Sequence, residues 1–421
     1  MTAMPEEASI LSFEGARALI EEHASRLRPK GRELLEILDA QGRVLAEPIH
    51  ADRDFPPFPR ATRDGYAIRA ADLDQLPTDL QIIGEIKAGG TSSALSVKSG
   101  QAAAIMTGAP APEGADAVVM IEHTSHVGNR VRVTRRVAAG ENIVAVGTEA
   151  KLGDRLLAGG VRIGYAEVAV AASVGRSRVL VHAKPRVAVL STGDEVVDID
   201  VPLGPYQIRN SNSFSLAAQV QAAGGEAVVL PIAPDDPDRL RELLIEGMDS
   251  DLLLITGGVS MGKYDLVEQA LAELKAEFFF TGAQIQPGKP VVFGRLACRA
   301  GAPASETEEY KYFFGLPGNP ISTMVTFELF AKPMLEALAG ISSRNLVFTH
   351  AKLKSEIRTR TGLKRFLPAM LSGEFERGEV ELVRWQGSGD VASVARANCY
   401  AVIPPDRERI EAGEWVPVLL R

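Results

Sequence analysis

The chain has 421 residues, 46% of them hydrophobic, and a formal net charge of −8 from 46 basic and 54 acidic residues. This length requires several hydrophobic cores, and the acidic balance argues against nucleic acid or a membrane surface as a partner. Two cysteines without a CxxC motif and six histidines without a cluster argue against a disulfide scaffold and a zinc site. The acidic first residues and the absence of a long apolar run predict a cytoplasmic protein without a signal peptide or membrane span.

The first part of the chain predicts a domain built from two separate segments. Ser12 precedes an amphipathic stretch at 13–20 and predicts a capped helix, and a second helix is expected at 39–46. A proline-rich connector at 54–59 leads to short β-rich runs, which predict a small β-rich insert domain. A glycine-rich segment with a helix at 165–172 is then expected to return to the N-terminal helices.

The second half predicts a larger domain followed by a β domain. Residues 182–340 alternate between apolar β runs and amphipathic stretches, which predicts a doubly wound α/β domain. The expected strands are 186–190, 227–230, 252–255, 278–280, 291–293 and 312–315, and the expected helices are 213–223, 237–248, 266–274 and 321–338. Short β runs after residue 340 predict a C-terminal β-barrel or sandwich. The predicted fold is therefore multidomain α/β plus β, with domains at 1–50 together with 141–182, at 51–140, at 183–338 and at 339–421.

The α/β segment is organised around a corner at the end of its third predicted strand. Gly257 and Gly258 permit positive φ and a close ligand approach, while Thr256 and Ser260 add hydroxyls before a helix start. Free N–H groups at such a helix start favour an anion, most often phosphate. Asp265 suits this site if a divalent cation lies between its carboxylate and the phosphate. The alternative interpretation is that glycines between a strand and a helix serve only the turn.

Three other strand ends in this domain carry unusual sequences. They are Ser191-Thr192-Gly193-Asp194-Glu195, Pro234-Asp235-Asp236 and Gly315-Leu316-Pro317-Gly318-Asn319-Pro320. In an open α/β sheet, ligands bind beyond the carboxyl ends of the strands, which is where these segments are expected. Neither a Walker loop nor a G-x-G-x-x-G motif is present, which argues against the common nucleotide-binding motifs. In the β-rich domain, Asp64-Gly65 and Thr107-Gly108 form two more corners, for which an ordinary turn is the alternative interpretation.

Five motifs in this order resemble the MoeA family of molybdopterin molybdenumtransferases, which includes the gephyrin E region. They are Arg63-Asp64-Gly65-Tyr66-Ala67, Met106-Thr107-Gly108-Ala109, Ser191-Thr192-Gly193-Asp194-Glu195, Thr256-Gly257-Gly258-Val259-Ser260 with Asp265, and Leu316-Pro317-Gly318-Asn319-Pro320. The resemblance implies an elongated homodimer of four-domain subunits, whose third domain is shared with molybdopterin-binding adenylyltransferases. It also implies Mg²⁺-dependent insertion of molybdate, as a substrate, into adenylylated molybdopterin with release of AMP. This reaction is the last step of molybdenum cofactor biosynthesis, and other proteins of that process are implied as partners.

The resemblance also implies roles for single residues. Asp64 and Thr107 would act near the active site from the second domain, and the family allows them to do so across the dimer interface. Lys289 and Arg365 would supply cations for phosphate or an oxyanion. The implied Mg²⁺ ligands are Glu195, Asp235 and Asp265. The implied catalytic residues are Asp64, Thr107, Glu195, Asp235, Asp265, Lys289 and Arg365. The implied substrate-binding residues are Thr192, Gly193, Asp194, Asn210, Thr256, Gly257, Gly258, Val259, Ser260, Pro317, Gly318, Asn319, Pro320, Ser322 and Ser388.

The sequence departs from the family pattern at two positions. Arg63 stands where an apolar residue usually precedes Asp-Gly-Tyr-Ala. Gln286 stands where lysine is common, which removes a cation beside the implied oxyanion site. We therefore expect the substitution Gln286→Lys to tighten the dependence on molybdate.

Two other functions fit parts of the chain. The third domain alone could act as a molybdopterin adenylyltransferase, but that activity does not require three further domains or the motifs at Asp64 and Thr107. A non-catalytic scaffold that binds a partner peptide, as gephyrin does through its E region, is the second alternative. The acidic and glycine corners are those of the enzymatic members, which favours catalysis.

Overall fold

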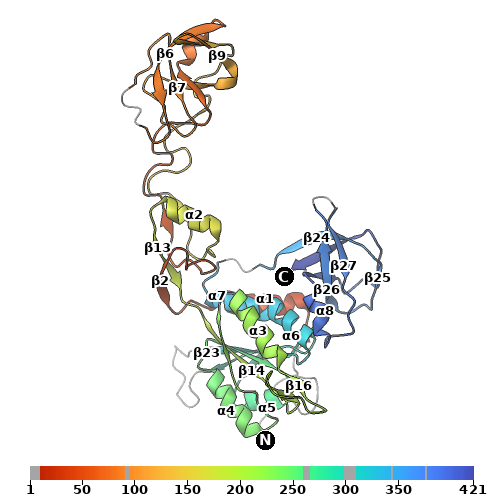
Figure 1. The fold of residues 1–421 in the computed structure, drawn as a ribbon. Helices are drawn as coiled ribbons and strands as arrows, with labels where there is room; N and C mark the ends of the chain where they lie inside the picture. Colours follow the sequence, from red (N-terminus) through yellow and green to blue (C-terminus); the bar gives the residue numbers. More distant parts are fainter. Residues whose placement is uncertain (1–9, 91–94, 259–265, 298–309, 343–344, 375–376) are drawn as a thin grey trace.

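The computed structural model of the protein describes residues 10–90, 95–258, 266–297, 310–342, 345–374 and 377–421. The chain is elongated (Figure 1). A β unit lies at one end, and a narrow stalk of two chain segments joins it to a small unit that contains helix α2. An α/β unit and a β-barrel lie beside each other at the opposite end.

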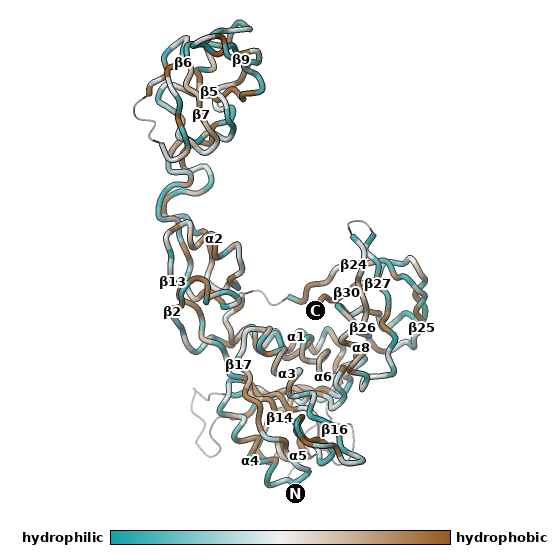
Figure 2. The backbone as a smooth tube through the Cα atoms, in the orientation of Figure 1, coloured by the Kyte–Doolittle hydropathy of each residue, from teal (hydrophilic) through white to brown (hydrophobic). Residues whose placement is uncertain are grey.

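The α/β unit is built on a six-stranded sheet with the order β17-β14-β18-β23-β22-β19. Four strands are parallel: β17 (Glu226–Val229), β14 (Arg186–Ser191), β18 (Leu252–Thr256) and β23 (Tyr310–Leu316). The last two, β22 (Val292–Ala297) and β19 (Glu277–Phe280), are antiparallel to their neighbours. Every residue of β18 is buried, because a parallel sheet with helices on both faces requires continuous apolar strands. Hydrophobic residues accordingly concentrate around β14 (Figure 2).

Helices cover both faces of this sheet. Helices α4 (Pro237–Gly247) and α5 (Leu266–Glu273) bury their apolar residues in one core with Leu190 and Leu253. The opposite core contains Val189 and Leu254 and is covered by α1 (Phe13–Arg26), α3 (Ser211–Ala222), α6 (Pro320–Thr326), the π-helical turn η4 (Phe327–Ala331) and α7 (Lys332–Leu338). Adjacent residues of each strand therefore point into different cores, and the predicted doubly wound α/β arrangement is confirmed.

Helix α1 packs onto the α/β unit. Ser12 caps it as predicted, because the backbone N–H of Gly15 donates to the Ser12 hydroxyl at 3.0 Å. The ring of Phe13 lies 5.2 Å from that of Phe366 in the barrel, so α1 also fills the junction between the two units. The preceding strand β1 (Ile10–Leu11) pairs with β20 (Gly282–Ala283).

The second predicted helix, at 39–46, is wrong. Residues 37–42 form turns, and Gly42 has a φ of +79°, which a right-handed helix does not accommodate. Val44 and Leu45 instead form β-bridges with Arg162 and Val181. These bridges tie the segment to the later half of the small α2-containing unit. Amphipathic spacing alone could not distinguish a helix from this turn.

The C-terminal region is a closed five-stranded barrel, as predicted. The ring order is β26-β27-β24-β30-β28, and the pairing of β26 with β28 closes it. The strands are β24 (Phe348–Leu353), β26 (Lys364–Ser372), β27 (Glu379–Leu382), β28 (Cys399–Ile403) and β30 (Trp415–Leu420). A short pair, β25 (Ile357–Arg358) and β29 (Arg409–Ile410), and helix α8 (Val391–Ala395) complete the unit. Strand β21 (Ile285–Gln286) of the α/β unit pairs in parallel with β26 and joins the two units.

The distal unit is a β structure, as predicted. Its six-stranded sheet has the order β8-β5-β7-β6-β10-β9. The strands are β5 (Gly65–Ile68), β6 (Thr78–Ile86), β7 (Gln101–Ile105), β8 (Ala117–Met120), β9 (Thr124–Val127) and β10 (Arg130–Val133), with the 3-10 turns η1 (Ala70–Leu73) and η3 (Ile121–His123). Val119 and Val131 belong to its own core, which is separate from the cores of the α/β unit.

Two antiparallel chain segments form the stalk. Strand β4 (Arg60–Ala61) pairs with β11 (Ile143–Val144) near the distal unit, and β3 (Ile49–His50) pairs with β12 (Arg155–Leu157) at the other end. Between them, Phe55 and Ala150 form a β-bridge, and the backbone N–H of Leu152 donates to Asp54 Oδ1 at 2.8 Å. The stalk leads into the small unit, which contains β2 (Arg32–Glu36), α2 (Tyr165–Ser173) and β13 (Arg178–His182).

Candidate functional site

The corners that follow β14, β18 and β23 lie together at the carboxyl edge of the sheet. Ser191, Thr256 and Leu316, the last residues of these strands, are in register across the sheet. The backbone N–H of Thr192 donates to the Thr256 carbonyl at 3.0 Å, so the first two corners are directly bonded. The topology therefore brings the predicted segments to one edge, as parallel strands require.

The glycines of the central corner are required by close packing. Gly257 and Gly258 have φ values of +89° and +60°, which favour glycine. A Cβ on Gly257 would lie 2.6 Å from the Thr192 carbonyl oxygen, and one on Gly258 would lie 2.7 Å from Val267 Cγ2. The conformation of the turn between strand and helix therefore explains, at least in part, why glycines occupy positions 257 and 258. Val259, Ser260 and Asp265 lie outside the described residues.

Two of the predicted substrate-binding side chains use their polar atoms inside the protein. Asn210 is 3% exposed and caps α3, because its Oδ1 accepts from the Ser213 backbone N–H at 3.1 Å and from the Ser191 hydroxyl at 2.9 Å. Thr256 is 2% exposed, and its hydroxyl donates to the Pro317 carbonyl at 3.1 Å. In contrast, Thr192 Oγ1 is buried without a hydrogen-bond partner among the described residues.

The corner after β23 continues directly into α6. Asn319 is the N-cap residue, but its side chain makes no capping bond, and Pro320 occupies the first helical turn. Gly318 and Asn319 are exposed, whereas Pro317 and Ser322 are buried. This corner is thus exposed at the sheet edge, although its Gly318 and Asn319 carbonyls accept hydrogen bonds from within the protein.

Asn212 and Thr323, which were not predicted, connect these corners. The Asn212 side chain donates to Thr256 Oγ1 at 3.0 Å and to the Gly318 carbonyl at 2.7 Å. Thr323 Oγ1 donates to the Asn319 carbonyl at 3.0 Å. The only sequence signal for Asn212 was its place two residues after the N-cap asparagine of α3.

Three carboxylates lie beyond β14 and β17. Asp194 Oδ1 accepts from the Asp235 backbone N–H at 3.0 Å, and Glu195 begins the segment that leads to β15 (Val196–Val197), which pairs with β16 (Ile208–Arg209). Partial burial and the negative charges of Asp194 and Glu195 raise the pKa of Asp235 above its ordinary value. Across the described residues, no three His, Cys, Asp or Glu side chains form a metal-ligand cluster.

Arg365 lies at the junction of the α/β unit and the barrel. Its register partner on β21 is Gln286. The Arg365 residue is 7% exposed, its Nη1 donates to the Leu363 carbonyl at 3.0 Å, and burial lowers the pKa of its guanidinium. No carboxylate of the described residues forms an ion pair with it. A buried guanidinium with unused N–H donors is suited to an oxyanion.

The other residues predicted on this side lie close to α6. The backbone N–H of Ile321 donates to the Ser388 carbonyl at 3.0 Å, which ties the barrel to the helix. A Cβ on Gly288 would lie 2.4 Å from Thr326 Cγ2, so the turn that carries Lys289 packs against the same helix. The half-buried Lys289 accepts from the Ala283 N–H through its carbonyl. The Ser388 and Gly288 segments thus pack against α6, the helix that begins directly after the Gly318 corner.

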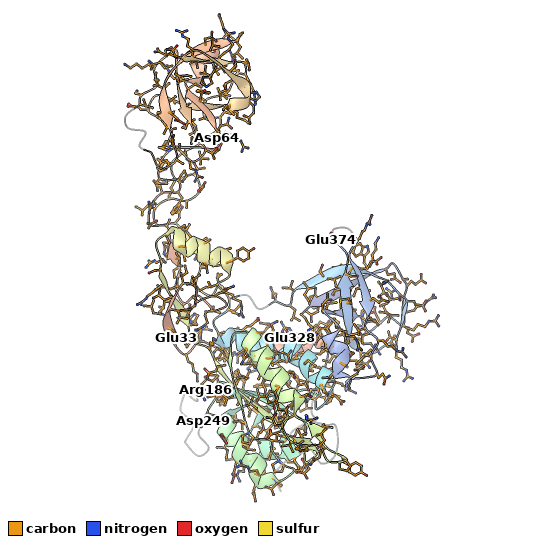
Figure 3. All side chains as sticks on the ribbon, viewed as in Figure 1. Glu33, Asp64, Arg186, Asp249, Glu328 and Glu374 are labelled. Carbon is orange, nitrogen blue, oxygen red and sulfur yellow. The ribbon has the colours of Figure 1, made fainter. Side chains whose placement is uncertain are left out.

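Asp64 and Thr107 lie together but in the distal unit (Figure 3). Asp64 Oδ1 accepts from the Thr107 backbone N–H at 2.6 Å, and this bond lowers the pKa of Asp64. Both residues are exposed, and Asp64 lies near the stalk end of the unit. Within one subunit, the stalk and the α2-containing unit separate them from the other predicted residues.

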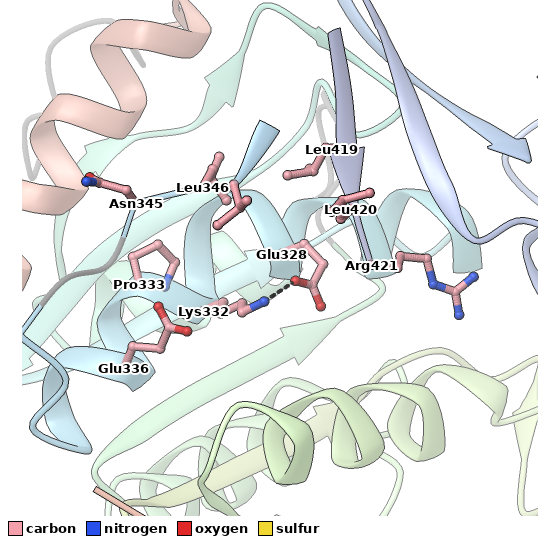
Figure 4. Close-up of a pocket in the computed structure, with 10 residues that line it drawn as sticks. Glu328, Lys332, Pro333, Glu336, Asn345, Leu346, Leu419, Leu420 and Arg421 are labelled. Atoms are coloured by element: carbon pink, nitrogen blue, oxygen red, sulfur yellow. Dashed lines mark hydrogen bonds and ion pairs between the residues drawn. The ribbon is translucent and has the colours of Figure 1, made fainter. Parts of the chain in front are cut away.

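A cavity of about 260 Å³ lies elsewhere, between α7, residues 345–347 that lead into β24, and the end of β30 (Figure 4). Lys332 donates to Glu328 at 2.8 Å on its wall, and burial raises the pKa of Glu336. None of the predicted site residues lines this cavity. In the described part of the chain, every helix is too short or too polar to cross a bilayer.

Comparison with known proteins assigns almost the whole chain. Residues 11–175 match the MoeA N-terminal region (domain I and II), residues 188–337 a probable molybdopterin binding domain, and residues 350–420 the MoeA C-terminal region (domain IV). The molybdopterin molybdenumtransferase of Synechococcus elongatus is 34% identical over 97% of this chain and 99% of its own. That of Nostoc sp. is 33% identical over 92% of this chain and 88% of its own. The crystal structure of the molybdopterin biosynthesis MoeA protein from Pyrococcus horikoshii OT3 is similar, with a TM-score of 0.76, 29% identity, and coverage of 98% of this chain and 100% of that one. The chain belongs to the MoeA family.

Proposed function

We propose that the protein inserts molybdate into adenylylated molybdopterin and releases AMP, the final step of molybdenum cofactor biosynthesis. The proposal rests on relatives that are named molybdopterin molybdenumtransferase and that align over 97% of this chain in one case. Alignment over all the units favours this reaction over adenylyl transfer, for which the central unit alone would suffice. The acidic and glycine corners of this chain are those of the enzymatic family members, which likewise favours catalysis over a purely scaffolding role.

The observation that carries the proposal is the environment of Arg365. A guanidinium that is 7% exposed, with one backbone hydrogen bond and no ion-pair partner in the described residues, carries a largely uncompensated charge. An oxyanion such as molybdate would compensate it and accept from its remaining N–H groups. Gln286, its register partner, and Ser388, which contacts α6, would border that anion.

The glycine corners would hold the phosphate-bearing part of the substrate. The segments at Gly257 and Gly318 expose backbone at the carboxyl edge of the sheet, where ligands of α/β proteins bind. Thr192 Oγ1, which is buried without a partner among the described residues, adds an unused hydroxyl beneath the first corner. The Lys289 side chain would supply a further positive charge from the turn that packs against α6.

We propose Mg²⁺ as the metal, although the described carboxylates do not by themselves form a cluster of three ligands. Burial and, after it, the negative charges of Asp194 and Glu195 raise the pKa of Asp235, so a cation placed beside these carboxylates would relieve their repulsion. Oxygen donors from carboxylates are the ligands that Mg²⁺ prefers. We propose Glu195 and Asp235 as ligands, together with Asp265, which lies outside the described residues. The bound metal would stabilise negative charge on the departing AMP.

We further propose a homodimer in which Asp64 and Thr107 complete the site of the partner subunit. Their bonded pair is remote from the other site residues of its own subunit (Figure 3). The small α2-containing unit and the stalk also expose large apolar side chains that a subunit interface would cover. Leu34, Leu38, Leu152 and Tyr165 are 59%, 76%, 68% and 88% exposed. A cytoplasmic location, and contacts with other proteins of molybdenum cofactor biosynthesis, complete the proposal.

The primary test follows AMP release from adenylylated molybdopterin and Mg²⁺, with and without molybdate. Release that requires molybdate, and that is lost when Asp265 is changed to alanine, would support the insertion reaction and the metal role together. Hydrolysis that is indifferent to molybdate would contradict the proposal while leaving the family assignment intact.

Subunit complementation tests the shared site. Asp64→Asn and Asp235→Asn chains are each expected to be inactive, and their co-expression produces hybrid dimers. If Asp64 serves the partner's site, each hybrid retains one intact site, and random assortment restores about a quarter of wild-type activity. A site made within one subunit would give no recovery, because every site would then carry one of the two substitutions.

A further inference from the structure

Asn212, in the first turn of α3, links two corners of the candidate site. Its Nδ2 donates to Thr256 Oγ1 at 3.0 Å and to the Gly318 carbonyl at 2.7 Å, which uses both N–H groups of the amide. The assignment of nitrogen and oxygen is fixed by chemistry, because the reverse orientation would set Oδ1 against the Gly318 carbonyl oxygen. One side chain therefore connects the end of β18 with the turn after β23.

The Asn212 bonds connect to a network of two buried threonines. The Thr256 hydroxyl, which accepts from Asn212, donates to the Pro317 carbonyl at 3.1 Å. Thr323 Oγ1 lies 3.4 Å from Thr256 Oγ1, and its hydroxyl has two acceptors within reach, the Pro317 carbonyl at 2.5 Å and the Asn319 carbonyl at 3.0 Å. Thr256 and Thr323 are 2% and 0% exposed, so solvent does not replace the bonds of their hydroxyls, whereas the bond from Asn212 to the Gly318 carbonyl lies at the surface. The network spans β18, the turn after β23 and the starts of α3 and α6.

This network controls backbone that is nearly in contact. A Cβ on Gly318 would lie 3.5 Å from Gly257 Cα, so the two glycine corners leave little space between them. Any loss of the Asn212 bonds would let one corner shift against the other. Asn212 Oδ1 is itself buried without a hydrogen-bond partner among the described residues, which opposes folding. The favourable contribution of the side chain is therefore its two donated bonds.

We propose that Asn212 is a positioning residue that sets the separation between the Gly257 and Gly318 corners and thereby the affinity for the phosphate-bearing part of the substrate. This inference rests on the proposed function, because it names how that site is kept in register. Asn212 acts through the backbone of the two corners. Molybdate is expected at Arg365, which bonds to the Leu363 carbonyl and not to this network, so we expect its binding to be independent of the corner spacing.

Steady-state kinetics of Asn212→Ala, measured well below the unfolding temperature, test the proposal. We expect the KM for adenylylated molybdopterin and the Kd for AMP to rise about tenfold, the effect of losing one or two net hydrogen bonds. The kcat and the half-saturating molybdate concentration should change less than twofold. The matched control is Ser215→Ala, which removes a 3.0 Å bond to the Asn212 carbonyl on the same helix without touching either corner. It should resemble the wild type.

A second variant keeps the test decisive if Asn212→Ala does not fold. Thr323→Val preserves shape but removes the hydroxyl, and it should raise the same KM. In the double variant, the rise should be no larger than in Asn212→Ala alone, because both substitutions break one network. Additive effects, or a lowered unfolding temperature with unchanged KM and Kd, would overturn the positioning role. Wild-type protein that lacks molybdate-dependent AMP release would instead refute the proposed function, whereas AMP binding by the variants still tests Asn212.

Discussion

Replacing Arg365 with methionine should move stability and activity in opposite directions. The methionine keeps an unbranched apolar stem but removes a charge that is 7% exposed and has no ion-pair partner in the described residues. Burial already lowers the pKa of this guanidinium, which means that the surroundings disfavour its charged form. The property that would suit Arg365 to an oxyanion therefore carries a cost in the free protein.

The expected stability change follows from two opposing contributions. The substitution loses the 3.0 Å bond to the Leu363 carbonyl, worth about 1 kcal/mol. It also removes an unpaired, partly buried charge, whose relief contributes about 2–3 kcal/mol at most. The difference is a stabilisation of about 1–2 kcal/mol, which should raise the melting temperature by a few degrees. Loss of the charged contact to molybdate should lower molybdate-dependent AMP release by about a hundredfold.

Thermal unfolding and AMP release are the two measurements, both made without and with molybdate. Molybdate should raise the melting temperature of the wild type but not of Arg365→Met. Arg358→Met is the control, because Arg358 is exposed in the same barrel and pairs with Glu356 at the surface. It should change stability by less than about 1 kcal/mol and leave activity intact. An Arg365→Met protein that unfolds at lower temperature, or that retains molybdate-dependent release, would refute the reasoning.

Three further predictions address other parts of the site. The pKa of Asp235 in the folded protein is raised above its ordinary value of 3.8. Its carboxylate therefore lowers the stability of the folded protein at pH values above the folded-state pKa. At pH values where Asp235 is protonated in both the folded and the unfolded protein, it does not change the stability. Asp235→Asn should therefore raise the melting temperature at pH 7 but not near pH 3, and it should remove the effect of added Mg²⁺; equal shifts at both pH values would contradict this. Gly288→Ala should destabilise the protein by about 1–3 kcal/mol, because φ is +100° and the new Cβ would lie 2.4 Å from Thr326 Cγ2; an unchanged denaturant midpoint would show that the turn adapts. Gln286→Lys should lower the half-saturating molybdate concentration, since it adds a cation in register with Arg365, and an unchanged value would count against this role.

The fold could be predicted where the apolar pattern is unambiguous. The continuous run at Leu252–Thr256 predicted a doubly covered strand, and the β runs after residue 340 predicted the closed barrel. The helix predicted at 39–46 failed because Gly42 adopts a left-handed conformation, which spacing does not encode. The four domain boundaries remain predictions.

The candidate site was predicted as segments but not as contacts. Parallel topology explains why Thr192 and Thr256 meet at one edge, and this followed from the order of strands. Sequence could not show that the Thr256 hydroxyl points inward, or that Asn212 bonds to residues 44 and 106 positions away. Such bonds depend on side-chain direction in three dimensions. The roles of Asp64 and Thr107 remain predictions, because the stalk keeps both residues away from the other predicted site residues of the same chain.

The stalk makes the reach of the distal unit a matter of chain length. Strand pairs join its two segments at both ends, and the hydrogen bond between Leu152 and Asp54 joins them in the middle. Each residue of an extended strand advances about 3.3 Å, so two residues added to both segments would move Asp64 outward by about 7 Å. Residues added to one segment alone would instead form a bulge and bend the stalk. The number of residues in the two stalk segments, rather than their chemical character, thus sets the distance between Asp64 and the small α2-containing unit.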